Sequence, residues 1–113
     1  MILANNGKLN NKQILKEETI KLMLEEYVDV YSEENEYLYT EGLSCHKFKK
    51  LLNNRIIYGH TGSALGCSNA LWFDPISHSG IIILDNFMPN EKENNINIIL
   101  NQILNEYNNN YFN

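Results

Sequence analysis

The sequence predicts an α+β fold: an N-terminal helix, an antiparallel sheet of three or four strands, and a C-terminal helix packed on that sheet. Three observations indicate this order. Apolar residues recur at helical spacing near both ends of the chain, short runs of β-branched and aromatic residues fill the middle, and turn-forming residues separate those runs. The C-terminal helix must cover its apolar side, and the preceding sheet is the nearest surface for it.

The first helix is predicted from the four-residue spacing of Leu15, Thr19, Met23 and Tyr27. Acidic residues fall in its first turn, where the helix dipole favours negative charge. Lys16 is a poor N-cap residue, so the sequence places the start of the helix only to within a residue or two.

Strands are expected over residues 37–45, with a bend at Gly42, over residues 55–60 and over residues 67–73. A fourth strand is expected at 81–84, where an unbroken apolar run indicates burial on at least one face. These four segments would form the antiparallel sheet.

Of two further segments between these strands, only the second has a clear predicted structure. Residues 48–52 are ambiguous between strand and other structure. Residues 74–80 are expected to form a hairpin connection, because Pro75 can set a turn there.

The C-terminal helix has the clearest pattern, because its apolar residues follow helical spacing over three turns. They are Ile96, Ile99, Leu100, Ile103, Leu104 and Tyr107. We expect the middle four of these side chains in the core. The opposite face is mostly Asn and Gln, and Asn97 and Asn101 are expected at the surface. Residues 108–113 are expected to be a frayed tail.

Composition limits the class of protein. The 113 residues suit one compact domain or part of a larger one, and 43% apolar residues suffice for a core. The formal net charge of −5 disfavours nucleic-acid binding. No apolar run reaches the length of a membrane span. Cys45 and Cys67 are too few for a disulfide framework, so we expect reduced thiols, with one structural bridge as the alternative.

The segment Tyr58-Gly59-His60-Thr61-Gly62-Ser63 carries the candidate functional site. Gly62 lacks a side chain, so a ligand could approach the strand edge closely there. Thr61 offers a hydroxyl group, His60 a side chain that titrates near neutral pH, and Ser63 a backbone N–H that could donate to an oxyanion. Spacing alone also fits a glycine-rich turn with a chance histidine.

Further motifs before and after that segment occur in the same order as the motifs of one family of enzymes. The chain resembles the serine β-lactamase and penicillin-binding-protein-like family, which includes class C β-lactamases, D-alanyl-D-alanine carboxypeptidases and related esterases. The resemblance covers about residues 1–105 through five segments in order: Gly7-Lys8-Leu9-Asn10 with Ile14-Leu15-Lys16-Glu17-Glu18-Thr19, Tyr39-Thr40-Glu41-Gly42-Leu43, Tyr58-Gly59-His60-Thr61-Gly62, Leu71-Trp72-Phe73-Asp74-Pro75, and Gly80-Ile81-Ile82-Ile83-Leu84-Asp85-Asn86. Lys16 departs from the serine usual at its place.

The resemblance implies that the chain, residues 1–113, is a single partial domain: the C-terminal segment of an incomplete β-lactamase-like hydrolase domain. His60, Thr61 and Gly62 would form the third active-site motif, and Ser63 would supply one oxyanion-hole amide. The family's nucleophile, a Ser-x-x-Lys on a helix, would lie upstream. The literal match Ser44-Cys45-His46-Lys47 falls beside a strand, so we interpret it as coincidence. We therefore expect no activity from the chain alone, and no cofactor or metal.

Two functions remain open at this stage. The chain either contributes the His-Thr-Gly wall of such an active site, together with the missing N-terminal part of the parent enzyme, or is a non-catalytic binding or self-assembly module. An uncovered sheet edge, expected at 37–45, or a helix swap would then give a homodimer or oligomer. No leader is predicted at the N-terminus, which suggests the cytoplasm, whereas the resembled enzymes belong to the cell envelope or are secreted.

Overall fold

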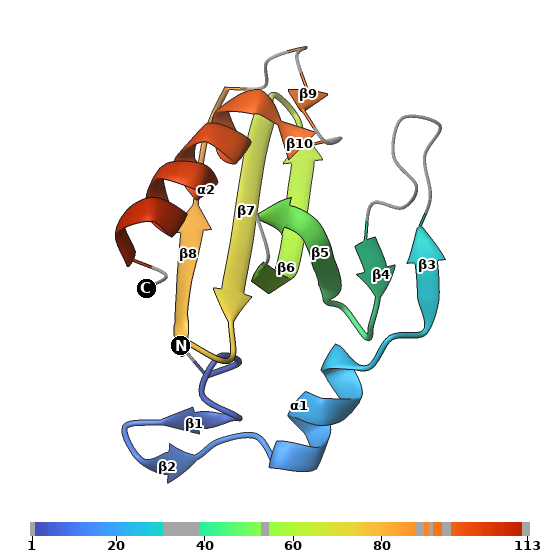
Figure 1. Ribbon diagram of the computed structural model, residues 1–113, viewed down its shortest axis with the longest axis vertical. Coiled ribbons are helices and arrows are strands. Elements are labelled where there is room, and N and C mark those ends of the chain that lie inside the picture. The colour runs from blue at the N-terminus through green and yellow to red at the C-terminus, as the bar shows by residue number, and fades with distance from the viewer. Residues whose placement is uncertain are drawn as a thin grey trace.

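The structure, a computed structural model, describes residues 2–30, 39–52, 55–87, 90, 92–93 and 96–111. Its centre is a six-stranded antiparallel sheet in which every strand pairs with the next strand of the sequence (Figure 1). The strands are β3 (Val28–Val30), β4 (Tyr39–Glu41), β5 (His46–Leu52), β6 (Arg55–Ala64), β7 (Cys67–Asp74) and β8 (Ser79–Ile83). The α+β class is confirmed, but the expected number of strands is wrong.

The additional strands are the short β3 and the seven-residue β5. In β5, Leu51 and Leu52 are both buried, although neighbouring residues of a regular strand face opposite sides. The β5–β6 register shifts between Phe48 and Leu52, and this irregularity allows both leucines inside. It also explains why residues 48–52 show no clean two-residue period.

The sheet edges differ from the prediction. The expected edge at 37–45 corresponds to β4 in its described part, since residues 37 and 38 lie outside the described residues. Because β4 pairs with β3 on one side and β5 on the other, it is an interior strand. The edge strands are β3 and β8. The prediction was wrong because β3, three residues after the first helix, had not been recognised.

Helix α1 (Glu17–Leu24) lies within the predicted range, and Lys16 precedes it without a side-chain capping bond. Helix α2 (Ile98–Tyr111) continues through residues 108–111, while 112–113 lie outside the described residues. In the described parts of the chain, neither helix has the length and apolar character that a membrane span requires. Short antiparallel pairs join β1 (Lys8–Leu9) to β2 (Lys12–Gln13) and β9 (Lys92–Glu93) to β10 (Ile96–Asn97).

Apolar side chains cover both faces of the sheet. Trp72 and Phe73 are neighbours on β7, so they face opposite sides, and both are fully buried. Trp72 belongs to the larger cluster, which includes Leu100 and Leu104 of α2. Phe73 packs in a second cluster with Ala4 and with α1. Trp72 therefore fills the core.

The buried side of α2 is rotated from the predicted one. Leu100 and Leu104 are buried as expected, but Ile103 is 38% exposed. Asn97 and Asn101, which were expected at the surface, are 8% and 2% exposed. The predictions for these three side chains are wrong. The physical reason lies at the start of the helix.

That start is set by Asn97, which ends β10 and precedes α2. Its side-chain Oδ1 accepts a hydrogen bond from the Ile99 N–H at 2.9 Å, as an N-cap residue does. The cap holds Asn97 inside the fold. At the other end of the helix, the Tyr107 hydroxyl donates to the Gly80 carbonyl of β8 at 3.1 Å, which fixes α2 across the sheet.

Candidate functional site

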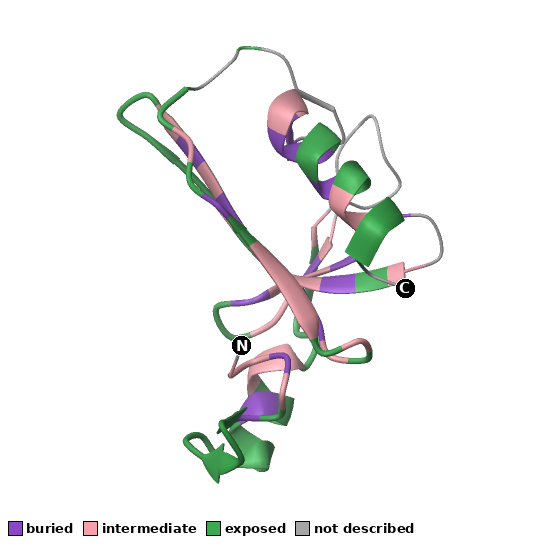
Figure 2. Cartoon of the chain, turned by 90° about the vertical axis from the view of Figure 1, so that its left-hand side faces the viewer, coloured by how far each residue is buried: buried purple, intermediate pink, exposed green. Residues whose placement is uncertain are grey.

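The predicted site residues lie on the outer half of the β6–β7 hairpin. His60, Gly62 and Ser63 are exposed and Thr61 is half-buried. The two-residue turn that closes the hairpin has positive φ at both positions, 52° at Leu65 and 81° at Gly66, as in a type I′ turn. In Figure 2 this far end of the hairpin is coloured as exposed. The site is therefore an accessible segment of one strand.

One edge of this segment has no partner strand in the described part of the chain. On one side β6 pairs with β7 over its length from Tyr58 to Ala64. On the other side the register with β5 ends at the pair His46–Gly59. Since the described residues contain no further strand of the sheet between β5 and the hairpin tip, residues beyond Gly59 form a local open edge.

The hydrogen bonds of β7 show which backbone groups face that open edge. The Ser68 N–H donates to the Asp85 carbonyl at 3.1 Å, on the side of β7 away from β6. Ser63 and its partner Ser68 are therefore a non-hydrogen-bonded pair, and the N–H and C=O of Ser63 point away from β7. Because this alternation has a period of two, the N–H and C=O of Thr61 point the same way.

Three aromatic rings from neighbouring strands stack up to the start of this edge. The Tyr39 ring lies on the His46 ring with centroids 4.0 Å apart, and the His46 ring lies 4.3 Å from the His60 ring. Nδ1 of His60 is 2.5 Å from the Thr61 carbonyl oxygen. A carbonyl oxygen only accepts, so a hydrogen bond at this contact requires the proton to be on Nδ1. His60 is thus held against the backbone group that follows it.

The environment of His46 disfavours its charged form. Burial lowers the pKa of His46, the neighbouring His60 lowers it further, and Glu41 acts in the opposite direction. The Glu41 carboxylate lies 4.0 Å from His46 Nε2, within the range of a weak ion pair when the imidazole is protonated. The neutral form of His46 is therefore favoured within this row of aromatic rings beside the open edge.

The two glycines of the motif have different environments. Gly59 has φ of 154°, and a Cβ atom there would lie 1.9 Å from the Leu71 carbonyl oxygen, so only glycine fits. No atom approaches within 4 Å of the Cβ position at Gly62. Gly59 therefore has a structural role, and Gly62 leaves free space beside the open edge.

The literal Ser-x-x-Lys lacks the arrangement of a nucleophile and its base. Ser44 lies in the turn between β4 and β5 with φ of 61°, whereas Lys47 lies in β5, not one helical turn further on. The Lys47 ammonium binds the Glu26 carboxylate, and this contact, with a second from Lys49, lowers the pKa of Glu26 to about 2. The geometry agrees with the interpretation of this motif as coincidence.

Cysteine and metal chemistry gain no support within the described residues. Cys45 and Cys67 are free thiols, and burial raises the pKa of Cys45. No group of three His, Cys, Asp or Glu side chains in the described ranges is placed to hold a metal ion. The rings of His46 and His60 lie with their centroids 4.3 Å apart and their planes tilted by 39°.

Asp74 of the predicted Asp-Pro motif has a structural environment. Its carboxylate is buried and binds the Arg55 guanidinium at 2.6 Å, the Ile76 N–H at 2.7 Å and the Ser77 hydroxyl at 3.0 Å. Burial alone would raise the pKa of Asp74, but these hydrogen bonds together lower it. The residue holds the β7–β8 turn. The Arg55–Asp74 pair and the His46–His60 contact were not found from sequence, because each depends on strand register.

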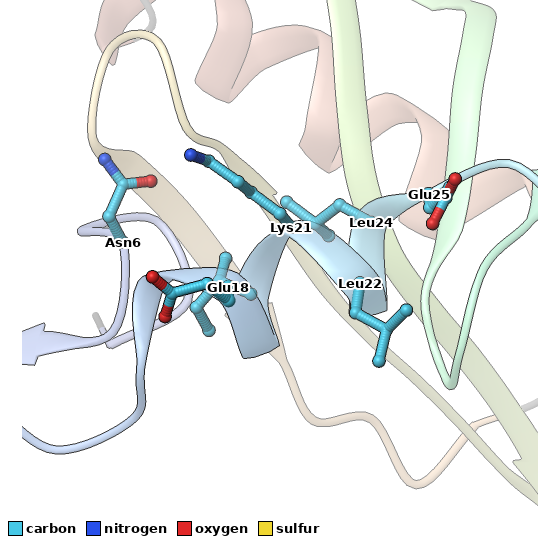
Figure 3. A pocket seen from close by; sticks show the side chains of 7 residues that line it. Asn6, Glu18, Lys21, Leu22, Leu24 and Glu25 are labelled. Atoms are coloured by element: carbon cyan, nitrogen blue, oxygen red, sulfur yellow. The ribbon is translucent and has the colours of Figure 1, made fainter.

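A depression elsewhere on the molecule lacks the open strand edge and the row of aromatic rings found at the β6 site. It runs along α1 and is lined by Asn6, Glu18, Ile20, Lys21, Leu22, Leu24 and Glu25 (Figure 3). Its charged and apolar side chains come mostly from one exposed helix, and it contains none of the predicted site residues. The open edge of β6 remains the best candidate site.

Comparisons of the chain with protein-family models, with curated proteins and with solved structures found no match.

Proposed function

We propose that the chain binds an extended, peptide-like ligand along the open edge of β6, as the His-Thr-Gly wall of a serine hydrolase of the β-lactamase and penicillin-binding-protein type. The observation that carries this proposal is the orientation of Thr61 and Ser63, whose backbone N–H and C=O groups point away from β7. An extended ligand can pair with such groups as an added strand.

The chemistry of the same edge supports an acyl ligand in particular. The Ser63 N–H can donate to a carbonyl oxygen that acquires negative charge. The Thr61 hydroxyl can bind a second oxygen of the ligand, and the space beside Gly62 admits close approach of its backbone. The nucleophile would come from residues outside this chain, so we expect recognition of the ligand but no turnover.

Nuclear magnetic resonance titration with an N-acetylated peptide ending in D-Ala-D-Ala tests the proposal. We expect the largest shifts at the amides of Thr61 and Ser63. Ser63→Pro removes the N–H from the open edge and should abolish binding, whereas the matched Ser63→Ala keeps the N–H and should preserve it. Equal binding by both variants, or shifts confined to other elements, would contradict the proposal.

A second candidate function is self-assembly through β8, favoured by the exposure of its apolar side chains. No described strand pairs with the outer side of β8. Ile82 within this strand is 61% exposed, and Leu84 just after its end is 82% exposed. An open edge with adjacent apolar side chains is a surface on which two copies can pair about a two-fold axis.

Light scattering at micromolar concentration distinguishes this candidate. We expect a dimer for the unmodified chain and a monomer for Ile82→Lys, because a charge next to the edge opposes pairing. Ile76→Lys is the matched control, since Ile76 is also exposed but lies in the β7–β8 turn. A monodisperse, soluble monomer of the unmodified chain would exclude self-assembly through β8.

A further inference from the structure

We propose that His60 is an autoinhibitory latch on the open edge of β6, an inference that rests on the edge-binding function above. In the closed state its imidazole occupies the Thr61 carbonyl, and a ligand strand can pair fully only after the ring has moved. The latch would make the edge selective for ligands that can displace it.

The first step of the argument is the competition for one acceptor. The Thr61 carbonyl points to the open edge, where an incoming strand would direct an N–H. His60 Nδ1 already lies 2.5 Å from this oxygen. A side chain bonded to its own neighbouring backbone offers that backbone an alternative to sheet pairing. Ligand binding must therefore break or bend the existing contact.

The second step concerns what holds the ring in place. The His46 side chain is only 16% exposed and is stacked on Tyr39, with the Phe48 ring at 5.9 Å. It is therefore a fixed support. His60 is exposed, and its ring lies against this support with the two ring centroids 4.3 Å apart and the ring planes tilted by 39°. Because one ring is packed and the other is not, His60 is the part that moves.

Protonation of both histidines should open the latch. The titratable groups that face the ring pair from the described strands are Tyr39 and Glu41 on β4, in addition to the two histidines. A single proton leaves the contact closed, because an imidazolium still donates to the Thr61 oxygen. Two protons place like charges on rings whose centroids lie 4.3 Å apart, and the resulting repulsion moves the exposed His60 ring away from His46. The edge should therefore open when both histidines are charged.

The binding experiment compares the unmodified chain with His60→Ala, using the D-Ala-D-Ala peptide as the probe. Removing a competing hydrogen bond should lower Kd about fivefold at pH 7.5. The unmodified chain should bind more tightly at a pH low enough to protonate His46, whose pKa is lowered by burial and by the neighbouring His60. His46→Phe keeps a stacking ring that cannot be charged, so it should remove most of this pH dependence while circular dichroism shows a retained fold.

The ring can also be observed without any ligand. Long-range ¹H–¹⁵N correlation spectra report which His60 nitrogen carries the proton, and the latch requires Nδ1–H at neutral pH. An Nε2–H tautomer overturns the latch. Equal Kd values for the unmodified chain and His60→Ala also overturn it, while leaving the edge-binding function intact. Absence of binding by both proteins overturns the edge-binding function itself.

Discussion

Truncation of Leu104 and of its neighbour Ile103 tests how α2 packs on the sheet. Leu104 is 0% exposed in the cluster that contains Trp72, whereas Ile103 is 38% exposed. Burial of a whole leucine side chain stabilises a fold by about 1.5–3 kcal/mol. The cavity that Leu104→Ala leaves raises the expected loss to about 3–4 kcal/mol. For Ile103→Ala we expect about 1 kcal/mol or less, because part of the side chain already contacts water and alanine favours the helix.

Urea denaturation followed by circular dichroism and by the fluorescence of Trp72 measures both losses on the same chain. Trp72 is fully buried against α2, so its emission reports separation of helix and sheet directly. Similar losses for the two variants would refute the described orientation of α2. Similar losses are what the orientation predicted from sequence spacing requires, because that orientation places both Ile103 and Leu104 in the core.

Four further predictions concern other parts of the chain. Arg55→Met should lower the free energy of unfolding by about 2 kcal/mol, because the buried Asp74 loses its cationic partner, and a loss under about 0.5 kcal/mol would contradict this. The pKa of Asp74 in the folded protein lies below the ordinary value of 3.8. The ionised carboxylate therefore stabilises the fold at pH values above 3.8, and this stabilisation is lost as the pH falls through the lowered pKa. Asp74→Asn should flatten this acid dependence of the free energy of unfolding, measured by urea denaturation at successive pH values. Gly59→Ala should prevent stable folding or cost about 3 kcal/mol or more, while Gly62→Ala, in open space, should cost about 0.5 kcal/mol or less by thermal melting. Intact-mass spectrometry after incubation with a fluorescent penicillin should show no adduct, and a stoichiometric adduct on Ser44 would revive it as a nucleophile.

The sequence predicted those elements whose pattern is regular over their whole length. The β-branched run Ile56-Ile57 lies in β6, the apolar run at 81–83 lies in β8, and Leu100 and Leu104 face the core. In each case the spacing of apolar residues matches the period of the element, so burial on one face follows from the pattern. Strand β6 extends to Ala64, past the predicted end at residue 60, so the candidate segment lies within the strand.

What the sequence did not predict depends on strand register or on a local hydrogen bond. The Asn97 cap turns the helix so that Asn101 is buried and Ile103 is not, and apolar spacing alone does not contain that rotation. His46 and His60 meet only because β5 and β6 pair in one register. The open backbone groups beyond Gly59 likewise depend on where the pairing with β5 ends.

The neighbour-to-neighbour order of the sheet has a consequence for the time course of folding. Each strand can close a short loop onto the strand before it, and short loops close at low entropic cost. The ends of the chain join over longer distances: the Tyr107 hydroxyl reaches Gly80, 27 residues away, and the His78 ring reaches the Ala4 carbonyl, 74 residues away. During synthesis α2 emerges from the ribosome after the strands of the sheet, so the sheet face around Trp72 stays bare until α2 has emerged. This interval is when a nascent chain is most exposed to aggregation.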